Sequence, residues 1–199
     1  MSDHAIRVDP LPDTCAIAFK EWAGVCDALA SGRQSLILRK GGIEEGPGGF
    51  APEHPAFWLY PTFVHEGEQG LKHPSSRSRS ADAGVVEIDT MAVVETVARV
   101  DSIDALLRLD SLHDWTEETV RKRFDYRQPG LWVLGVRVYR KPEPARIEVT
   151  PTQHGCKTWV PLEAGISTVG LVPVLDDVQA DHDRDRLATL LTPIEGPER

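Results

Sequence analysis

The stretch LWVLGVRVYR, Leu131–Arg140, is the clearest strand in this 199-residue chain, and the expected fold is built outward from it. A turn at Pro129 and Gly130 leads into it. Arg137 and Tyr139 share one face of the stretch. The other face carries apolar side chains, which are Trp132, Leu134, Val136 and Val138. This alternation predicts a strand with one face in the core.

Five further stretches have the composition or the alternation of strands. They are Ser35–Arg39, Phe57–Val64, Val86–Val100, Arg146–Thr150 and Lys157–Leu162. The stretch Val86–Val100 alternates along most of its length, which predicts a long, bent strand. Pro61 interrupts FWLYPTFV and lacks a backbone N–H, so that strand requires an edge or bulged position.

Helices are expected in four segments. The first runs from Asp13 or Thr14 to about Ser31, because apolar residues recur there at spacings of three and four. These residues are Ala16, Phe19, Trp22, Cys26 and Leu29. Gly32 then stands where a left-handed C-cap is expected. The other helices are expected from Asp101 or Ser102 to Leu109, from the capping box Asp114–Glu117 to about Tyr126, and over Asp176–Leu191.

The order of these elements decides the expected fold class. The strands are spaced too irregularly for repeated βαβ units, so the sequence predicts an α+β fold, a small mixed β-barrel with flanking helices. We expect a single domain over residues 14–162. Residues 1–13 are expected to form an N-terminal arm, and residues 163–199 an acidic C-terminal extension.

Charge and composition exclude several classes of protein. The net charge is −9, but residues 81–120 carry −8, residues 121–157 carry +6 and residues 158–199 carry −5. A basic block inside an acidic chain is compatible with a selective anion site, although acidic neighbours can also neutralise it. There is no apolar run long enough to span a membrane and no visible secretory signal, and the three cysteines are scattered. We therefore expect a cytoplasmic protein with no membrane partner.

Motifs for metals and phosphate loops are missing. The chain has no CxxC and no HExxH, and His154 with Cys156 is its only close His/Cys pair. The glycine-rich loop 41–49 is not followed by the GK[ST] of a phosphate loop. The sequence therefore predicts neither a metal nor a cofactor.

Basic and aromatic side chains on the predicted strands suggest a ligand site. Six residues are candidates for binding, namely Arg39, Lys40, Trp58, Tyr60, Arg137 and Tyr139. Aromatic rings beside arginine on a sheet can stack bases and hold phosphates. His65 and Glu66, which follow FWLYPTFV, are candidates for an acid/base pair. Structural roles in the core or in a loop are the alternative for each of these residues.

Five ordered motifs carry a family resemblance. They are FKEW (Phe19–Trp22), LILRKGGI (Leu36–Ile43), FWLYPT (Phe57–Thr62), RVYRKPEP (Arg137–Pro144) and GCKTWV (Gly155–Val160). Together they resemble an uncharacterised bacterial domain-of-unknown-function family, number 1802, over about residues 17–177. The resemblance supplies a family but no activity.

A remoter similarity concerns Gly32–Arg39. This stretch is similar to the G-x-K-x-x-E-x-R motif of ASCH domains, which are relatives of the PUA RNA-binding barrels. Gly32 and Arg39 match the motif, whereas its Lys is Gln34 here and its Glu is Ile37. The similarity implies a barrel with a cleft that binds RNA. Some members carry amidohydrolase activity that relies on the motif's Lys, an amine that Gln34 does not supply.

The function expected from the sequence is binding of RNA or a nucleotide-like ligand in a basic, aromatic-lined cleft. Two alternatives stay open, so whether the chain is an enzyme is undecided. One is a hydrolase acting on RNA or a nucleoside-like amide, with His65 and Glu66 for acid/base chemistry and Arg39 for charge stabilisation. The other is a protein-interaction module whose acidic regions dock a basic partner.

Overall fold

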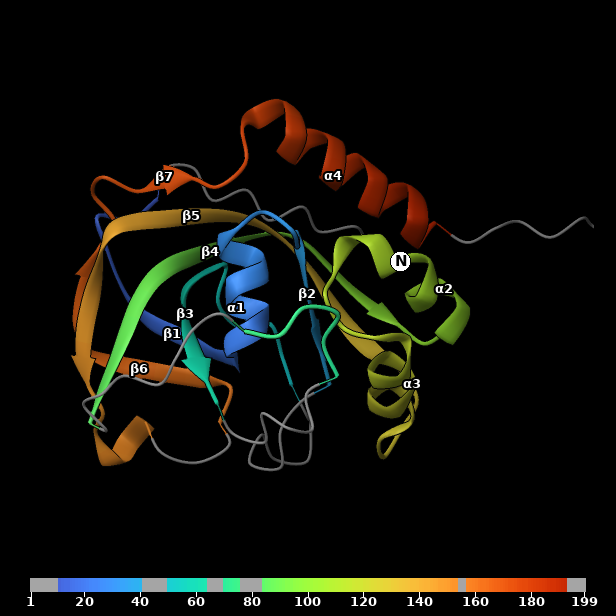
Figure 1. The fold of residues 1–199 in the computed structure, drawn as a ribbon, viewed down its shortest axis with the longest axis horizontal. Coiled ribbons are helices and arrows are strands. Elements are labelled where there is room, and N and C mark those ends of the chain that lie inside the picture. The colour runs from blue at the N-terminus through green and yellow to red at the C-terminus, as the bar shows by residue number, and fades with distance from the viewer. Residues whose placement is uncertain (1–10, 41–49, 64–69, 76–83, 154–156, 193–199) are drawn as a thin grey trace, which may run out of the picture.

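The computed structural model describes residues 11–40, 50–63, 70–75, 84–153 and 157–192. In these residues seven strands form one sheet of order β2-β5-β4-β3-β1-β6, with β7 paired to β5 (Figure 1). The strands are β1 (Thr14–Trp22), β2 (Leu36–Arg39), β3 (Ala56–Thr62), β4 (Val85–Val100), β5 (Leu131–Glu148), β6 (Trp159–Ser167) and β7 (Val172–Pro173). β1 and β3 are parallel, and the other pairs are antiparallel.

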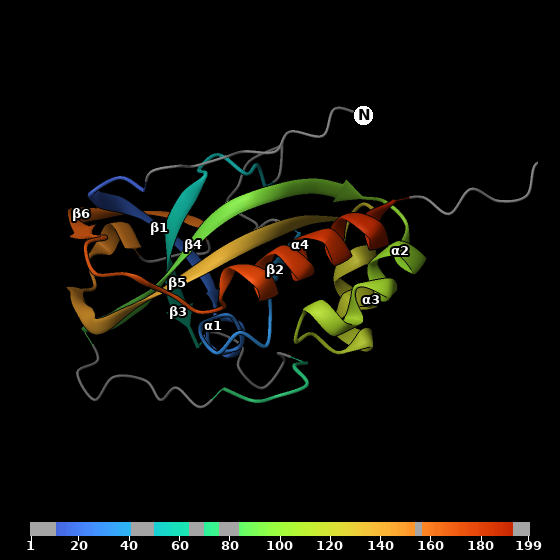
Figure 2. The ribbon, with the colours of Figure 1, turned by 90° about the horizontal axis from the view of Figure 1, so that it is seen from above.

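Four α-helices accompany the sheet in the described part of the chain. They are α1 (Ala23–Ala30), α2 (Ile103–Arg108), α3 (Glu117–Asp125) and α4 (Asp177–Leu191), and two short 3-10 turns lie at Asp110–Leu112 and Pro151–Gln153. Seen from above, α2 and α3 gather at one end of the sheet, while α4 runs along β5 toward α2 (Figure 2). None of the described helices is long and apolar enough to cross a membrane.

The predicted strands are confirmed, and some of them are longer than expected. β5 contains LWVLGVRVYR and continues through Glu148, so Arg146–Thr150 is mostly its far end. β4 pairs with β5 along its length and has irregular register between Ile88 and Thr90 and between Val94 and Thr96, which are the expected bends. Pro61 pairs with β1 beyond the point where β4 stops pairing with β3, so its missing N–H costs no ladder bond to β4.

The helix expected from Thr14 is wrong in its first half. Thr14–Trp22 is strand β1, held between β3 and β6, and only Ala23–Ala30 is helical. The neighbouring residues Ala18 and Phe19 are both fully buried, so this strand carries apolar residues on both faces, and they fall at spacings that imitate a helical stripe. The predicted left-handed position after the helix is confirmed, because Gly32 has a φ of 74°.

Two hydrophobic cores are formed by the described residues. The larger core unites the sheet with α1, α2 and α3; it includes Phe19, Leu29, Phe57, Leu106, Phe124 and Leu134. The smaller core is built from strand residues and includes Cys15, Ala18, Trp58, Tyr60, Met91 and Val160. Because neighbouring residues of β1 and β3 alternate between the two cores, both faces of these strands are buried.

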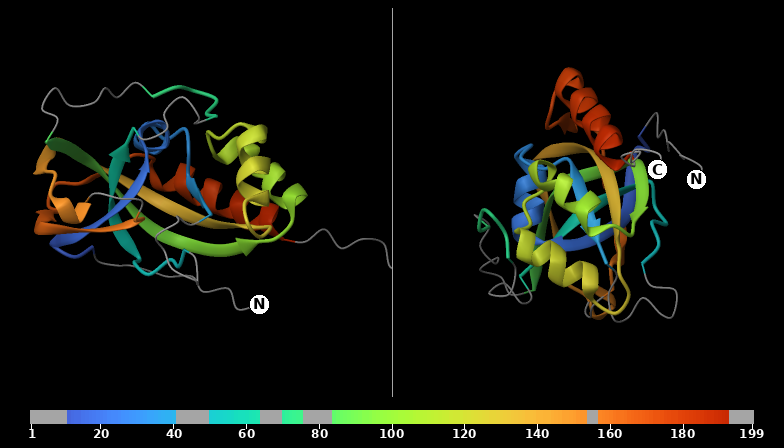
Figure 3. Two further views of the ribbon diagram at one scale, coloured as in Figure 1. Left: turned by 90° about the horizontal axis from the view of Figure 1, so that it is seen from below. Right: turned by 90° about the vertical axis from the view of Figure 1, so that its right-hand side faces the viewer.

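The fold class is α+β, as predicted, but the sheet is not a closed barrel. Its strand order ends at β2 on one side and at β6 on the other, with no pairing between them. Figure 3 shows the sheet curling around its inner side, with α4 outside the curl. After residue 162 the chain completes β6, adds β7 beside β5 and ends its described part in α4.

Candidate functional site

Arg39, the last residue of β2, connects the two open edges of the sheet by its side chain. Its Nη2 donates a hydrogen bond to the hydroxyl of Thr158, the residue immediately before β6. Its Nη1 lies 3.9 Å from Oε2 of Glu21 on β1. The guanidinium carbon lies 5.2 Å from the centre of the Phe19 ring. We call Arg39, Glu21 and Thr158 the seam cluster, because they stand where ladder hydrogen bonds are missing between β2 and β6.

Glu21 is the most unusual member of the seam cluster, because its carboxyl is almost completely buried. The residue is 3% exposed. Its Oε1 accepts a hydrogen bond of 2.7 Å from the backbone N–H of Trp22, and its backbone carbonyl accepts one from Thr62. Its Oε2 is buried and accepts no hydrogen bond from any described residue. A buried carboxylate with an unmet acceptor is costly and needs a compensating partner.

Burial also shifts the pKa of this carboxyl. Loss of solvent raises the pKa of Glu21 above 4.5, and the nearby charges of Arg39 and Arg123 oppose that shift only in part. The side chain of Arg39 is 19% exposed, so the cluster reaches solvent at that residue. The site thus combines a buried carboxyl with a guanidinium at its outer end.

Aromatic side chains stand on both sides of the seam cluster. On one side the Arg123 guanidinium lies 5.0 Å from the Trp22 ring, which packs 5.4 Å from Trp115. On the other side Trp159 packs against Phe19 and Phe50, with ring centres 5.0 Å and 6.0 Å away. Trp22 and Trp159 are each only partly buried, which leaves ring surface for a further contact.

Lys40 follows Arg39 but has a structural role. Its Nζ donates to the carbonyl oxygens of Phe124 and Gly130, at 2.8 Å and 2.9 Å, and to that of Gln128. These bonds use the three donors of the ammonium group and fasten the end of β2 to the segment after α3. Burial lowers the pKa of Lys40, with a further lowering by Arg99.

Trp58 and Tyr60 lie in the smaller core, away from Arg39. Trp58 is fully buried and its indole N–H donates to the Cys15 carbonyl at 3.1 Å. Tyr60 is 5% exposed, with the Lys20 ammonium 5.8 Å from its ring centre, and burial raises its pKa. The expected stacking wall is therefore packed inside the protein, because both residues alternate onto the second buried face of β3.

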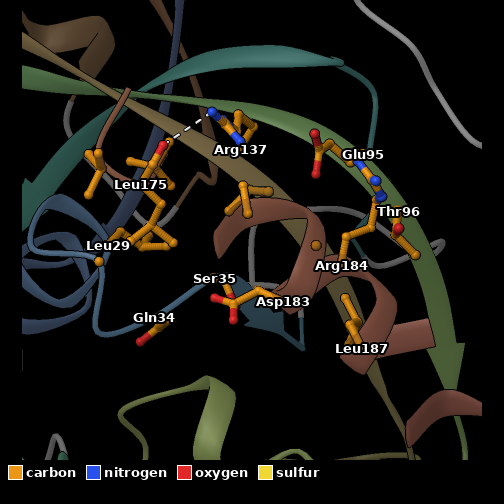
Figure 4. Close-up of a pocket in the computed structure, with 16 residues that line it drawn as sticks. Leu29, Gln34, Ser35, Glu95, Thr96, Arg137, Leu175, Asp183, Arg184 and Leu187 are labelled. Carbon is orange, nitrogen blue, oxygen red and sulfur yellow. Dashed lines mark hydrogen bonds between the residues drawn. The ribbon is translucent and has the colours of Figure 1, made fainter. Parts of the chain in front are cut away.

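Arg137 lies under α4, in a third location. Its Nη2 donates to the Leu175 carbonyl at 3.1 Å, drawn in Figure 4, and to Asp177 Oδ1 at 2.6 Å. It lines a pocket between α4 and the sheet. Glu95 and Arg184 also line this pocket, and burial raises the pKa of Glu95. Tyr139, two residues along β5, pairs with Pro173 of β7.

The catalytic candidates cannot be placed in the same way. His65 and Glu66 lie outside the described residues, as do the glycine-rich loop 41–49, His154 and Cys156. Thr62, the last residue of β3 before His65, is hydrogen-bonded to the backbone of Glu21. No group of three or more His, Cys, Asp or Glu side chains within the described ranges could hold a metal ion.

Two positions that align with the ASCH motif, Gln34 and Arg39, have different surroundings in the structure. Gln34, at the motif's Lys position, is buried, donates to the Leu36 carbonyl and accepts from the backbone N–H of Asp114. Arg39 alone of the predicted binding residues reaches the seam cluster. Sequence reasoning missed Glu21 and Arg123 as its companions, and the one available signal was the charged pair Lys20-Glu21 inside an apolar stretch.

Comparison with known proteins gives a family and a few distant structures. No curated protein sequence matches the chain. The crystal structure of ASCH from Zymomonas mobilis is similar at 13% identity and a TM-score of 0.42, covering 90% of this chain and 97% of that one. A ZmASCH mutant from the same organism is similar at 15% identity and a TM-score of 0.46, covering 77% and 92%. A family model described as a domain of unknown function, DUF1802, matches residues 18–184, so the protein belongs to the DUF1802 family, as its five motifs predicted.

Proposed function

We propose that the protein binds RNA or a nucleotide-like ligand at the seam cluster, in a PUA/ASCH-like domain over residues 14–162. One observation carries the proposal: two guanidinium groups, of Arg39 and Arg123, flank the buried carboxyl of Glu21 between partly exposed tryptophans. Arginine beside aromatic rings is a combination that holds the bases and the backbone of single-stranded nucleic acids. The match of Gly32 and Arg39 to the ASCH motif agrees with this assignment.

The proposal includes a reducing, cytoplasmic setting. Cys15 and Cys26 are buried free thiols, each inside a packed element. Such cysteines act as small apolar residues and need no disulfide for stability.

Replacement of Arg39 tests the proposal. Binding of a short single-stranded RNA and of nucleoside monophosphates is measured by filter binding and by tryptophan fluorescence at several salt concentrations. Arg39→Ala should weaken binding about tenfold or more, since hydrogen bonds to a charged group are lost. The affinity of Arg39→Lys should lie between those of the parent protein and Arg39→Ala, because lysine keeps the charge but not the planar guanidinium.

Arg186→Ala is the matched control, since Arg186 is an exposed arginine on α4 that donates to Ser111. It should bind as the parent protein does. Circular dichroism and melting curves show whether each variant is folded. Folded Arg39→Ala that binds as tightly as Arg186→Ala, with the same salt dependence, would contradict the proposal.

A second candidate function is a hydrolase acting on RNA or a nucleoside-like amide, with His65 and Glu66 as predicted. The buried carboxyl of Glu21 beside Arg39 favours it, because burial raises the pKa of this carboxyl and a carboxyl with a raised pKa is better suited to act as a general acid. Turnover should then depend on pH, and both His65→Ala and Glu21→Gln should abolish part of that dependence. Absence of turnover across a panel of RNAs and acylated nucleosides would rule this function out.

A further inference from the structure

The unmet acceptor of Glu21 points to the kind of group that the seam cluster recognises. Oε2 is buried without a hydrogen bond from the described residues, although Oε1 of the same carboxyl is satisfied by the Trp22 N–H. Arg39 Nη1 stands 3.9 Å away, beyond hydrogen-bond distance, so the ion pair leaves this acceptor unsatisfied. Glu21 Oε2 is a hydrogen-bond acceptor beside the Arg39 guanidinium, which is a donor. This pair is complementary to a ligand that carries a donor beside an acceptor.

The charge of the cluster argues against a phosphate at this point. Glu21 and Arg39 are a carboxyl and a guanidinium in one ion pair, so their charges largely cancel when both are ionised. A phosphate placed against Arg39 would also lie beside the Glu21 carboxyl, and like charges repel strongly where solvent is excluded. Furthermore, Nη2 of Arg39 is already bonded to Thr158, and the Phe19 ring lies against the guanidinium face. A neutral, planar group avoids that repulsion.

We infer that Glu21 is the specificity-determining residue of this site, and that with Arg39 it reads the edge of a nucleobase. Glu21 Oε2 accepts an N–H of the base, and Arg39 Nη1 donates to the neighbouring ring nitrogen or carbonyl oxygen. This inference rests on the proposed function and narrows it. The site recognises the base, and the phosphates of the ligand lie outside the Glu21–Arg39 pair.

The inference is tested with nucleosides, which carry the base edge but no phosphate. Cytidine, adenosine and uridine, their 5′-monophosphates and inorganic phosphate are titrated into the full chain by calorimetry. The Kd of a nucleoside should lie within about threefold of the Kd of its monophosphate. Inorganic phosphate should not displace the nucleoside. Glu21→Gln should weaken nucleoside binding about tenfold or more, because a charge-assisted hydrogen bond is lost.

Glu163→Gln is the matched control, since Glu163 is an exposed carboxyl on β6. It should leave binding unchanged. A second measurement needs no variant: methylation of the base N–H, as in 3-methyluridine or N4,N4-dimethylcytidine, should weaken binding to the parent protein by a similar factor. This arm keeps the inference testable if Glu21→Gln fails to fold.

The outcomes separate the inference from the proposed function. If monophosphates and RNA bind but nucleosides do not, or if Glu21→Gln binds phosphate more tightly, Glu21 is only a counter-charge and the inference is overturned. Equal binding of methylated and unmethylated bases overturns it too. If RNA, monophosphates and nucleosides all fail to bind the parent protein, it is the proposed function that fails.

Discussion

Among single residues, His113 couples folding to pH. It is 4% exposed, and its Nδ1 accepts the backbone N–H of Trp115, which leaves the proton on a buried Nε2 without a described partner. Burial, aided by Lys72, lowers the pKa of His113 from 6.5 to about 4. The native state therefore keeps the ring neutral where the unfolded chain already binds a proton.

The sign of the effect on stability follows from that difference. Above pH 6.5 the ring is neutral in both states, so the protonation of His113 does not lower the free energy of unfolding. Between pH 6.5 and pH 4 only the unfolded chain takes up the proton, so the free energy of unfolding should fall by about 3 kcal/mol. Urea unfolding of His113→Gln should show a flatter pH dependence in this window. His182→Gln, a change at an exposed histidine of α4, should keep the parent slope, and equal slopes in all three proteins would contradict the assignment.

The role of Glu21 could not be predicted from local sequence patterns. Its role depends on contact with Arg39, which lies 18 positions later in the chain on β2, a strand that does not pair with β1. Local patterns predicted Arg39 as a binding residue but not the buried carboxyl opposite it. Trp58 and Tyr60 were predicted to share a face, which is correct, but the pattern does not say that a second core covers that face.

Among the elements, α4 is attached to the sheet at few points. Only Ala180 and Leu187 of this helix are buried, and Arg137 holds its first turn through Asp177. Leu187 lies over Gly135 of β5, where an added Cβ would be 2.6 Å from Leu187 Cδ2 and 3.2 Å from Thr96 Cβ. Gly135 therefore makes room for the helix.

Gly135→Ala should consequently lift α4 from β5 and destabilise the protein by about 1–3 kcal/mol, the usual cost of overpacking. Leu187→Ala in the same chain should recover part of that loss, which a double-mutant cycle of urea unfolding measures. Gly84→Ala is the control, because no atom lies within 4 Å of a Cβ added there. Additive effects of the two substitutions would show that Gly135 and Leu187 are not coupled.

Helices whose ends carry their own signals were predicted well. Ser102 caps α2 and Asp176 caps α4, each accepting a backbone N–H as expected. The cap of α3 is Thr116 and not Asp114, because the Asp114 carboxyl bonds His73 instead. β1 was missed because its strand character depends on β3 and β6, which are distant in sequence. Local spacing cannot register such partners.

For the molecule as a whole, the proposed function predicts that substitutions in the smaller core affect stability and leave binding at the seam cluster unchanged. Trp58 is fully buried in the smaller core, whereas Phe19 and Arg39 face the larger one. Trp58→Phe should remove the hydrogen bond to Cys15 and lower the free energy of unfolding by about 1–2 kcal/mol. Affinity for RNA should stay within about twofold of the parent value. A loss of affinity larger than that, at a temperature where the variant is folded, would place Trp58 in the binding site after all.

The alternating charge blocks of the sequence also have a structural explanation at this scale. The acidic segment contains β4 and the basic segment contains β5, and these strands pair along their whole length. Arg140 bonds Asp89 at 2.9 Å across the pair, and Arg137 bonds Asp177 of α4. Part of the basic block is thus paired with acidic neighbours, as the simpler interpretation of the sequence expected, and Arg123 lies beside Trp22.

The hydrogen bond from Arg39 to Thr158 gives the seam cluster a mechanical role besides the recognition proposed for it, because it links the end of β2 to the residue before β6. A hydrogen-bonded ladder fixes the spacing of two strands by its backbone, whereas β2 and β6 are linked by side-chain contacts, the bond from Arg39 to Thr158 among them. A ligand that engages Arg39 as proposed should therefore also change the link between β2 and β6. Amide exchange in these two strands, measured with and without the ligand, would record that change.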